Sequence, residues 1–140
     1  MKARVLIGVL LVVGALIWVG AVLLGDDGSG DVTISANEAV NAVYPGRGDE
    51  VLQQSRVGVD LDARYQLVSL VVYPSDGQRD GVDVTVALRH STGLNLWEFI
   101  PGEGQPIQAL SPDTNCATAT YAPIAQPSET ETFSWCFEVS

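Results

Sequence analysis

The feature that most constrains this chain is an uninterrupted apolar run near its N-terminus. From Val5 to Leu24 every residue is apolar or glycine. A helix of this length, at about 1.5 Å per residue, spans roughly the 30 Å hydrocarbon core of a bilayer. Two basic residues precede the run and acidic residues follow it, which places the N-terminus in the cytoplasm. We therefore expect a cytoplasmic N-terminus (residues 1–4), a transmembrane signal-anchor helix (residues 5–24) in contact with membrane lipid, and an exported remainder.

A cleaved signal peptide is the alternative interpretation of the same run. Its apolar region is normally shorter, about 7–15 residues, and small residues mark the cleavage site. Here Leu23 and Leu24 occupy the place where small residues are needed, and no cysteine follows that could carry a lipid. The pattern favours a retained anchor in the cell membrane, with the C-terminal domain extracytoplasmic.

The part of the chain beyond the apolar run is strongly acidic. It contains five arginines and no lysine against all 17 acidic residues of the protein, and the whole chain has a net charge of −10. Such a surface repels nucleic-acid backbones, so we expect no nucleic-acid partner. We expect a flexible linker over residues 25–31, rich in Gly, Ser and Asp, and one folded domain over residues 32–140.

Apolar and polar residues alternate with a period of two through most of this domain, which is typical of strands covered on one face. Turn signals rich in Pro, Gly and Asp separate the runs, and no amphipathic helix longer than Asn37 to Val43 is indicated. The fold class we expect is an all-β, antiparallel, Ig-like β-sandwich after one transmembrane helix. The predicted strands are 31–35, 57–61, 67–73, 82–88, 94–100, 115–121 and 131–139.

The two cysteines can be placed by the same alternation. Cys116 and Cys136 each fall on the polar face of a predicted strand, so both point away from the core. If these strands are hairpin neighbours, a disulfide can join them across the outside of the sheet, as an exported domain allows. A redox-active or metal-binding pair is the alternative, but CxxC spacing and a nearby histidine are lacking.

Several segments of the domain resemble bacterial Ig-like domains. The likeness extends over residues 44–140, although Asp113 stands where that family usually has glycine. It implies a rigid presenting or binding module with no catalytic residues. The segments that carry it are Pro45-Gly46 before Val57-Gly58-Val59-Asp60-Leu61, then Leu110-Ser111-Pro112-Asp113-Thr114-Asn115, and finally Phe133-Ser134-Trp135-Cys136-Phe137.

The sequence argues against an enzyme, because no GxSxG, HExxH or P-loop spacing is present. The one histidine, His90, has the simpler interpretation of an ordinary loop residue. Some periplasmic copper carriers share the Ig-like architecture but bind copper through histidines and methionines. Here Met1 is the only methionine, so copper carriage is disfavoured and no cofactor is expected.

A weak calcium site is indicated by Asp76, Asp80 and Asp83, because calcium takes carboxylate oxygens as ligands. Their spacing fits no recognised calcium loop, and Asp-Gly pairs are common in tight turns. The three aspartates therefore remain weak candidates, with a turn as the simpler interpretation.

The predicted strand from Leu94 to Ile100 is apolar on both faces, with Trp97 and Phe99 sharing one of them. Aromatic residues are enriched at interfaces, so this pair is the candidate docking patch, with core packing as the alternative. The main hypothesis is a non-catalytic, membrane-anchored accessory or binding protein for an envelope or membrane-complex partner. The alternative is an extracytoplasmic carrier of a small ligand or of calcium. A lined pocket would favour the carrier and a flat patch the docking module.

Overall fold

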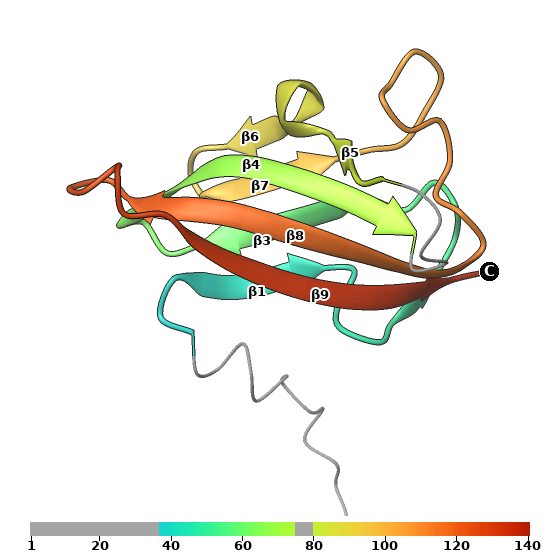
Figure 1. The fold of residues 1–140 in the computed structure, drawn as a ribbon, viewed down its shortest axis with the longest axis horizontal. Coiled ribbons are helices and arrows are strands. Elements are labelled where there is room, and N and C mark those ends of the chain that lie inside the picture. Colours follow the sequence, from blue (N-terminus) through green and yellow to red (C-terminus); the bar gives the residue numbers. More distant parts are fainter. Residues whose placement is uncertain (1–36, 75–79) are drawn as a thin grey trace, which may run out of the picture. The chain divides into compact units, whose positions relative to one another are not determined.

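The structure is a computed structural model that describes residues 37–74 and 80–140. In these residues two β-sheets pack face to face, and the one helical element is a 3₁₀ turn, η1 (Thr85–Ala87) (Figure 1). Across these two ranges no helix has the length and apolar character needed to cross a membrane. The predicted anchor over residues 5–24, the linker and the predicted strand over residues 31–35 lie outside the described residues.

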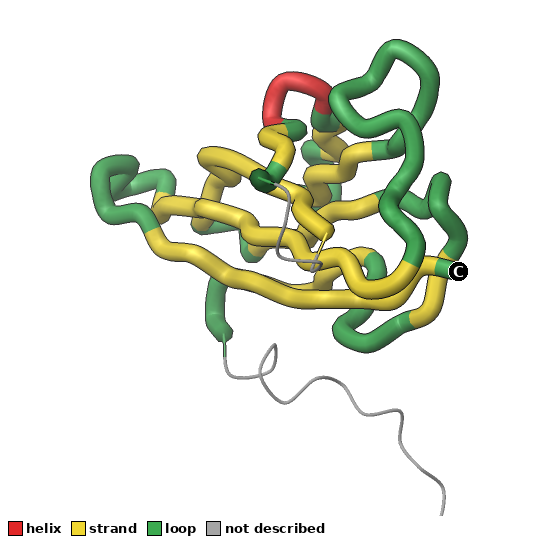
Figure 2. Tube along the Cα trace, turned by 45° about the vertical axis from the view of Figure 1, so that its right-hand side comes forward, coloured by secondary structure: helices red, strands yellow, loops and turns green. Residues whose placement is uncertain are grey.

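Each sheet combines strands from distant parts of the chain, which Figure 2 shows as two layers of strands joined by loops. In spatial order the first sheet contains β1 (Val40–Tyr44), β3 (Val57–Leu61), β7 (Leu96–Phe99) and β6 (Arg89–Ser91). The second contains β2 (Glu50–Val51), β9 (Glu131–Val139), β8 (Asp113–Pro123), β4 (Tyr65–Pro74) and β5 (Val82–Asp83).

The expected all-β sandwich is confirmed, but it is not wholly antiparallel. β2 runs parallel to β9 at the edge of the second sheet. The chain reaches this edge from β1 of the other sheet, and the Gly48 N–H donates to the Cys136 carbonyl as it crosses. The crossing segment enters the second sheet in the same direction as β9, so the short pairing of β2 with β9 is parallel.

The pairing of β8 with β9 follows the predicted alternation closely. Ala117 lies opposite Trp135 and Ala119 opposite Phe133, and all four side chains are buried. The two alanines leave the space that the neighbouring aromatic rings fill, which is how close-packed interiors accommodate large side chains. On the other face of β9, alternate residues are exposed.

The alternation over residues 82–88 led to a wrong prediction of one strand with its apolar side chains on a single face. Only β5 is a strand here, and the chain then turns through η1. Val84 is fully buried in the core, whereas Val86 is 95% exposed at the turn. The two valines therefore have opposite environments despite their shared place in the pattern.

Local hydrogen bonds explain this departure. The hydroxyl and the backbone N–H of Thr85 both donate to the Asp83 carboxylate, and the Thr85 hydroxyl accepts from the Leu70 N–H. Such side-chain to backbone bonds compete with strand pairing and favour a turn. The chain leaves the second sheet at this point and continues as β6 of the first.

The segment from Asn37 to Val43, the longest helix candidate, is also not helical. Its second half belongs to β1, which pairs with β3. The Asn37 side-chain oxygen accepts from the backbone N–H groups of Ala39 and Val40, forming a turn that leads into the strand. Over so short a segment the apolar pattern fits a helix and a strand equally well. Pairing with β3 makes the second half a strand.

Candidate functional site

A cavity of about 250 Å³ lies at one end of the sandwich. Its walls are β4, β5, the start of β8 and the β7–β8 loop, which comprises residues 100–112. The lining residues are Val72, Tyr73, Asp80, Val82, Pro106, Ile107, Gln108, Ala109, Leu110, Ser111 and Asn115.

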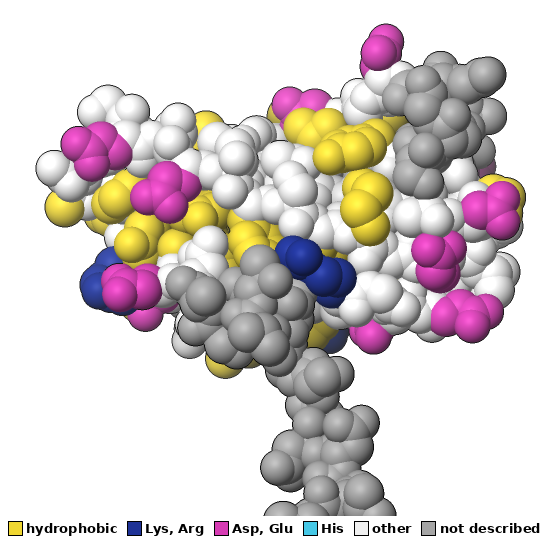
Figure 3. Space-filling model, turned by 60° about the horizontal axis from the view of Figure 1, so that its bottom comes forward, with side chains coloured by type: hydrophobic (Ala, Val, Ile, Leu, Met, Phe, Trp, Pro, Cys, Tyr) yellow, Lys and Arg dark blue, Asp and Glu magenta, His cyan; other side chains and the backbone are white. Residues whose placement is uncertain are grey.

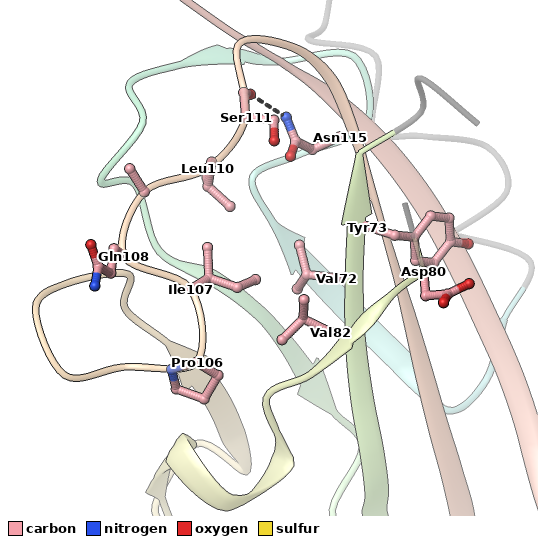
Figure 4. A pocket seen from close by; sticks show the side chains of 11 residues that line it. Val72, Tyr73, Asp80, Val82, Pro106, Ile107, Gln108, Leu110, Ser111 and Asn115 are labelled. Carbon is pink, nitrogen blue, oxygen red and sulfur yellow. Dashed lines mark hydrogen bonds between the residues drawn. The ribbon is translucent and has the colours of Figure 1, made fainter. Parts of the chain in front are cut away.

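The centre of this cavity is apolar. Figure 4 shows Val72, Val82, Ile107 and Leu110 pointing toward the same space, the first two from adjacent strands and the others from the loop. Val72 and Leu110 are buried, at 1% and 2% exposure, so the cavity reaches down to the hydrophobic core. Val82 and Ile107 are partly buried and form its sides.

Two of the polar lining residues, Asn115 and Tyr73, are engaged elsewhere. The Asn115 side-chain amide, only 2% exposed, donates to the carbonyl oxygens of Ser111 (2.7 Å) and Asp113 (3.3 Å). The Tyr73 hydroxyl is hydrogen-bonded to Thr118 on the outer face of the sheet. In Figure 4 the Asp80 carboxylate and the Tyr73 ring lie across β4 from the four apolar side chains.

The β7–β8 loop is held in place by backbone hydrogen bonds. The Leu110 N–H donates to the Gln53 carbonyl, and the Gly102 N–H donates to the Ile107 carbonyl, so the loop is closed on itself and tied to the body of the domain. Gly104 has a φ of +76° within this loop, a conformation that glycine adopts without strain. These bonds fix the loop wall of the cavity.

The sequence did not predict this cavity. The loop residues Ile107 and Leu110 show no strand periodicity, and nothing in the local pattern says which strand they approach. The only available signal was the presence of these apolar side chains in a segment otherwise rich in Pro, Gly and polar residues. Such residues in a loop indicate packing against the body of the protein.

The predicted docking pair divides between two environments. Phe99 is fully buried opposite Val57, so this ring belongs to the core and the predicted patch is reduced to Trp97. Trp97 is partly buried, and its ring stacks on His90 with centroids 3.7 Å apart and planes at 8°. Docking at Trp97 stays a prediction.

The Trp97–His90 pair is organised by Asn95. The Asn95 side-chain oxygen accepts from the Trp97 indole N–H (3.3 Å) and lies 3.2 Å from His90 Nε2. Its amide donates to the carbonyl oxygens of Asp62 and Tyr65 in the neighbouring turn. His90 therefore lies in β6, the edge strand of the first sheet, and not in the loop that the sequence indicated.

Of the three weak calcium candidates, Asp76 lies outside the described residues, and calcium at this place stays a prediction. Asp80 is exposed, and the Asp83 carboxylate accepts from Thr85. The bonds from the Thr85 hydroxyl and N–H lower the pKa of Asp83 below the ordinary aspartate value. Over residues 37–74 and 80–140, no three His, Cys, Asp or Glu side chains are grouped to hold a metal ion.

The predicted disulfide is confirmed. Cys116 and Cys136 are directly opposite each other in the β8–β9 pair and are bonded. Both lie on the outer face of the sheet, because their neighbours Ala117 and Trp135 face the core. The pair is thus a structural crosslink between β8 and β9 on the outer face of the second sheet.

Acidic side chains are distributed rather than concentrated. On the face seen in Figure 3 they are spread around the periphery, with a hydrophobic area between them and basic side chains in few places. One of the acidic groups is neutralised locally, since Asp62 forms an ion pair with Arg64 at 2.7 Å. The hydrogen bond from Arg64 lowers the pKa of Asp62.

Comparisons with known proteins identify the fold but no family. No protein-family model matches the chain, and no curated protein matches it by sequence. Among solved structures, it is similar to CopC from Methylosinus trichosporium OB3b, with a TM-score of 0.54, 10% identity, and coverage of 74% of this chain and 94% of that one. It is also similar to PcoC, a methionine-rich copper resistance protein from Escherichia coli, with a TM-score of 0.50, 12% identity, and coverage of 75% and 100%.

The donor set of this chain does not fit copper, despite the shared fold. Cu(I) sites use thiolate and thioether ligands, and Cu(II) sites combine imidazole with other nitrogen or oxygen ligands. In the described ranges no three His, Cys, Asp or Glu side chains are grouped for this purpose. The sequence contains one histidine and one methionine, Met1, and both cysteines are bonded to each other. The single imidazole, that of His90, is stacked on Trp97.

Proposed function

We propose that the protein is a non-catalytic, extracytoplasmic binding module that holds a small ligand in the cavity between β4, β5 and the β7–β8 loop. Residues 5–24 anchor it in the membrane, and the sandwich acts as a carrier or receptor domain. This is the carrier hypothesis of the sequence in its small-ligand form. The lined cavity is the observation that carries it.

The size and lining of the cavity suit a small molecule. Ligand pockets are concave, mostly apolar, and have a volume of roughly 300–1,000 Å³ for drug-sized ligands. A cavity of about 250 Å³ therefore suits a smaller molecule. Asn115 and the loop backbone bonds hold the walls in place, so little ordering free energy would be lost on binding.

The cavity lies far along β4 from the first described residue of the chain. The described chain starts at Asn37, whose amide donates to the Tyr121 hydroxyl near the β8–β9 turn. In the β4–β8 pair, Tyr121 lies opposite Leu67, whereas the cavity residue Asn115 lies opposite Pro74. Seven residues of β4 separate these points, or roughly 23 Å at the strand rise. The cavity thus lies at the other end of β4 from the contact between Tyr121 and Asn37, the first described residue.

The accessory-protein hypothesis has lost part of its support. It depended on an aromatic patch at Trp97 and Phe99, and the second of these rings is in the core. A protein partner would need a contact surface elsewhere, and the cavity offers a concave site instead. We therefore place ligand binding first.

The carrier hypothesis can be tested by thermal unfolding of the full-length protein in lipid nanodiscs, with a panel of neutral and charged fragments. Hits should raise the unfolding midpoint of the wild type and lose this effect in Val82→Phe, which fills the cavity from β5. Val86→Phe is the matched control, because that side chain is exposed on η1 outside the cavity. Equal responses in both variants would contradict the proposal.

A further inference from the structure

We infer that the cavity selects an uncharged molecule with a compact apolar body of about ten non-hydrogen atoms. This inference rests on the proposed function and names the class of ligand for the same site. Three observations carry it: the apolar centre, the existing hydrogen bonds of Asn115 and Tyr73, and the volume.

The charge of the ligand follows from the lining. Asp80 supplies the one ionisable carboxylate among the described lining residues, and it lies across β4 from the centre of the cavity (Figure 4). A charged group placed between Val72, Val82 and Ile107 would lose part of its water and have only apolar side chains beside it. Burying an unpaired charge is strongly unfavourable, so both cations and anions are disfavoured.

The polarity of the ligand follows from the hydrogen bonds. The donors of Asn115 are given to Ser111 and Asp113, and the Tyr73 hydroxyl is bonded to Thr118. A polar ligand that paired with either of these two groups would have to break its existing bond. This costs binding free energy, whereas an apolar body needs no such partner.

The size follows from the volume. An apolar cavity of about 150 Å³ is known to accommodate benzene, which has six carbon atoms. In proportion, the 250 Å³ measured here corresponds to about ten non-hydrogen atoms. Indole, with its fused rings and neutral N–H, is therefore a suitable probe. Tryptamine and indole-3-acetate carry the same ring system with a positive and a negative charge.

The test uses methyl NMR of the full-length protein in lipid nanodiscs, labelled at isoleucine. Ile107 lines the cavity and reports binding. Ile124 is 56% exposed, and its N–H donates to the Arg64 carbonyl just before β4, at the opposite end of the sandwich, so it serves as the internal control. We expect indole to shift the Ile107 signal saturably, with at least tenfold tighter binding than either charged analogue, and to leave Ile124 unchanged.

Two cavity-filling variants test whether the shift of the Ile107 signal arises from binding in the cavity. Val82→Phe should abolish the indole response, and Ala109→Trp fills the cavity from the loop side in case the first variant does not fold. Val86→Phe should bind indole as the wild type does. A response that survives both cavity-filling variants would overturn the assignment.

The remaining outcomes separate the inference from the proposed function. If a charged analogue binds at Ile107 as tightly as indole, the ligand class is wrong although the cavity is still a ligand site. If N-acetyl-leucinamide binds more tightly than indole, the occupant is a side chain of a partner protein, and the inference is overturned. If no probe shifts Ile107, or Ile124 shifts equally, the proposed function fails as well.

Discussion

Cys116 and Cys136 lie directly opposite each other in the β8–β9 pair and are joined by a disulfide, with Cα atoms 4.0 Å apart. The bond closes a loop with a sequence separation of 20 residues. It therefore restricts the unfolded chain more than the folded one, in which the two strands are already paired by their backbone.

Replacing both cysteines with serine should destabilise the domain by about 3 kcal/mol, which is the chain-entropy estimate for a loop of this length. Denaturant unfolding of the full-length protein, compared with and without reductant, measures this difference. Reductant should destabilise the wild type and leave the double variant unchanged. A double variant as stable as the oxidised wild type would show that the crosslink has no stabilising role.

The valines on either side of Thr85 should respond very differently to truncation. Val84→Ala removes methyl groups from the fully buried core and should cost about 2 kcal/mol. Val86→Ala acts on a side chain that is 95% exposed and should change stability by no more than about 0.5 kcal/mol. Similar losses at both positions would mean that the segment is a continuous strand with one buried face, contrary to the structure.

Asn95 should be difficult to replace. Its φ of +48° lies in the left-handed region, and its amide satisfies the carbonyl oxygens of Asp62 and Tyr65. Asn95→Ala combines backbone strain with two lost hydrogen bonds and should cost about 2 kcal/mol.

Asn95→Gly is the control for that change, because glycine accepts the left-handed conformation but provides no side-chain bonds. It should be destabilised by about half as much. The fluorescence of Trp97 should change in both variants, since its indole loses its acceptor. An alanine variant with wild-type stability and unchanged fluorescence would contradict this role.

The Asp83 carboxylate should make folding sensitive to acid. Hydrogen bonds from Thr85 lower its pKa in the folded state below the ordinary aspartate value of about 3.9. Its stabilising contribution is therefore fully present above that ordinary value and is lost as the pH falls through the lowered folded pKa.

A carbon NMR titration of the Asp83 carboxyl group measures this directly, and its midpoint should lie below 3.9. Thr85→Val removes the hydroxyl donor and should move the midpoint upward, toward the ordinary value. An unchanged midpoint in that variant would mean that the hydroxyl does not determine the pKa.

The sequence predicted most reliably where long alternation coincides with burial on one face. In β9, the side chains of Phe133, Trp135 and Phe137 all face the core, and this strand begins and ends where the alternation does. The disulfide was predicted from the same alternation, which places Cys116 and Cys136 on the outer face of the sheet. Over residues 82–88 the alternation was equally regular but shorter, and two hydrogen bonds from Thr85 to Asp83 were enough to override it.

The functional site was much less predictable, because it depends on contacts between distant segments. Phe99 could be assigned to the core only once β7 was known to lie beside β3, where Val57 faces it. The cavity requires Ile107 and Leu110, from an irregular loop, to lie against Val72 and Val82. Loop placement of this kind is set by tertiary hydrogen bonds such as that between Leu110 and Gln53, which leave no periodic pattern.

The most direct test of the ligand-binding account is native mass spectrometry of the full-length protein released from its own membrane in lipid nanodiscs. The account predicts one low-mass organic adduct on the wild type and on Val86→Phe, and none on Val82→Phe. Identical spectra for the three proteins, or a metal ion as the only stoichiometric adduct, would contradict it.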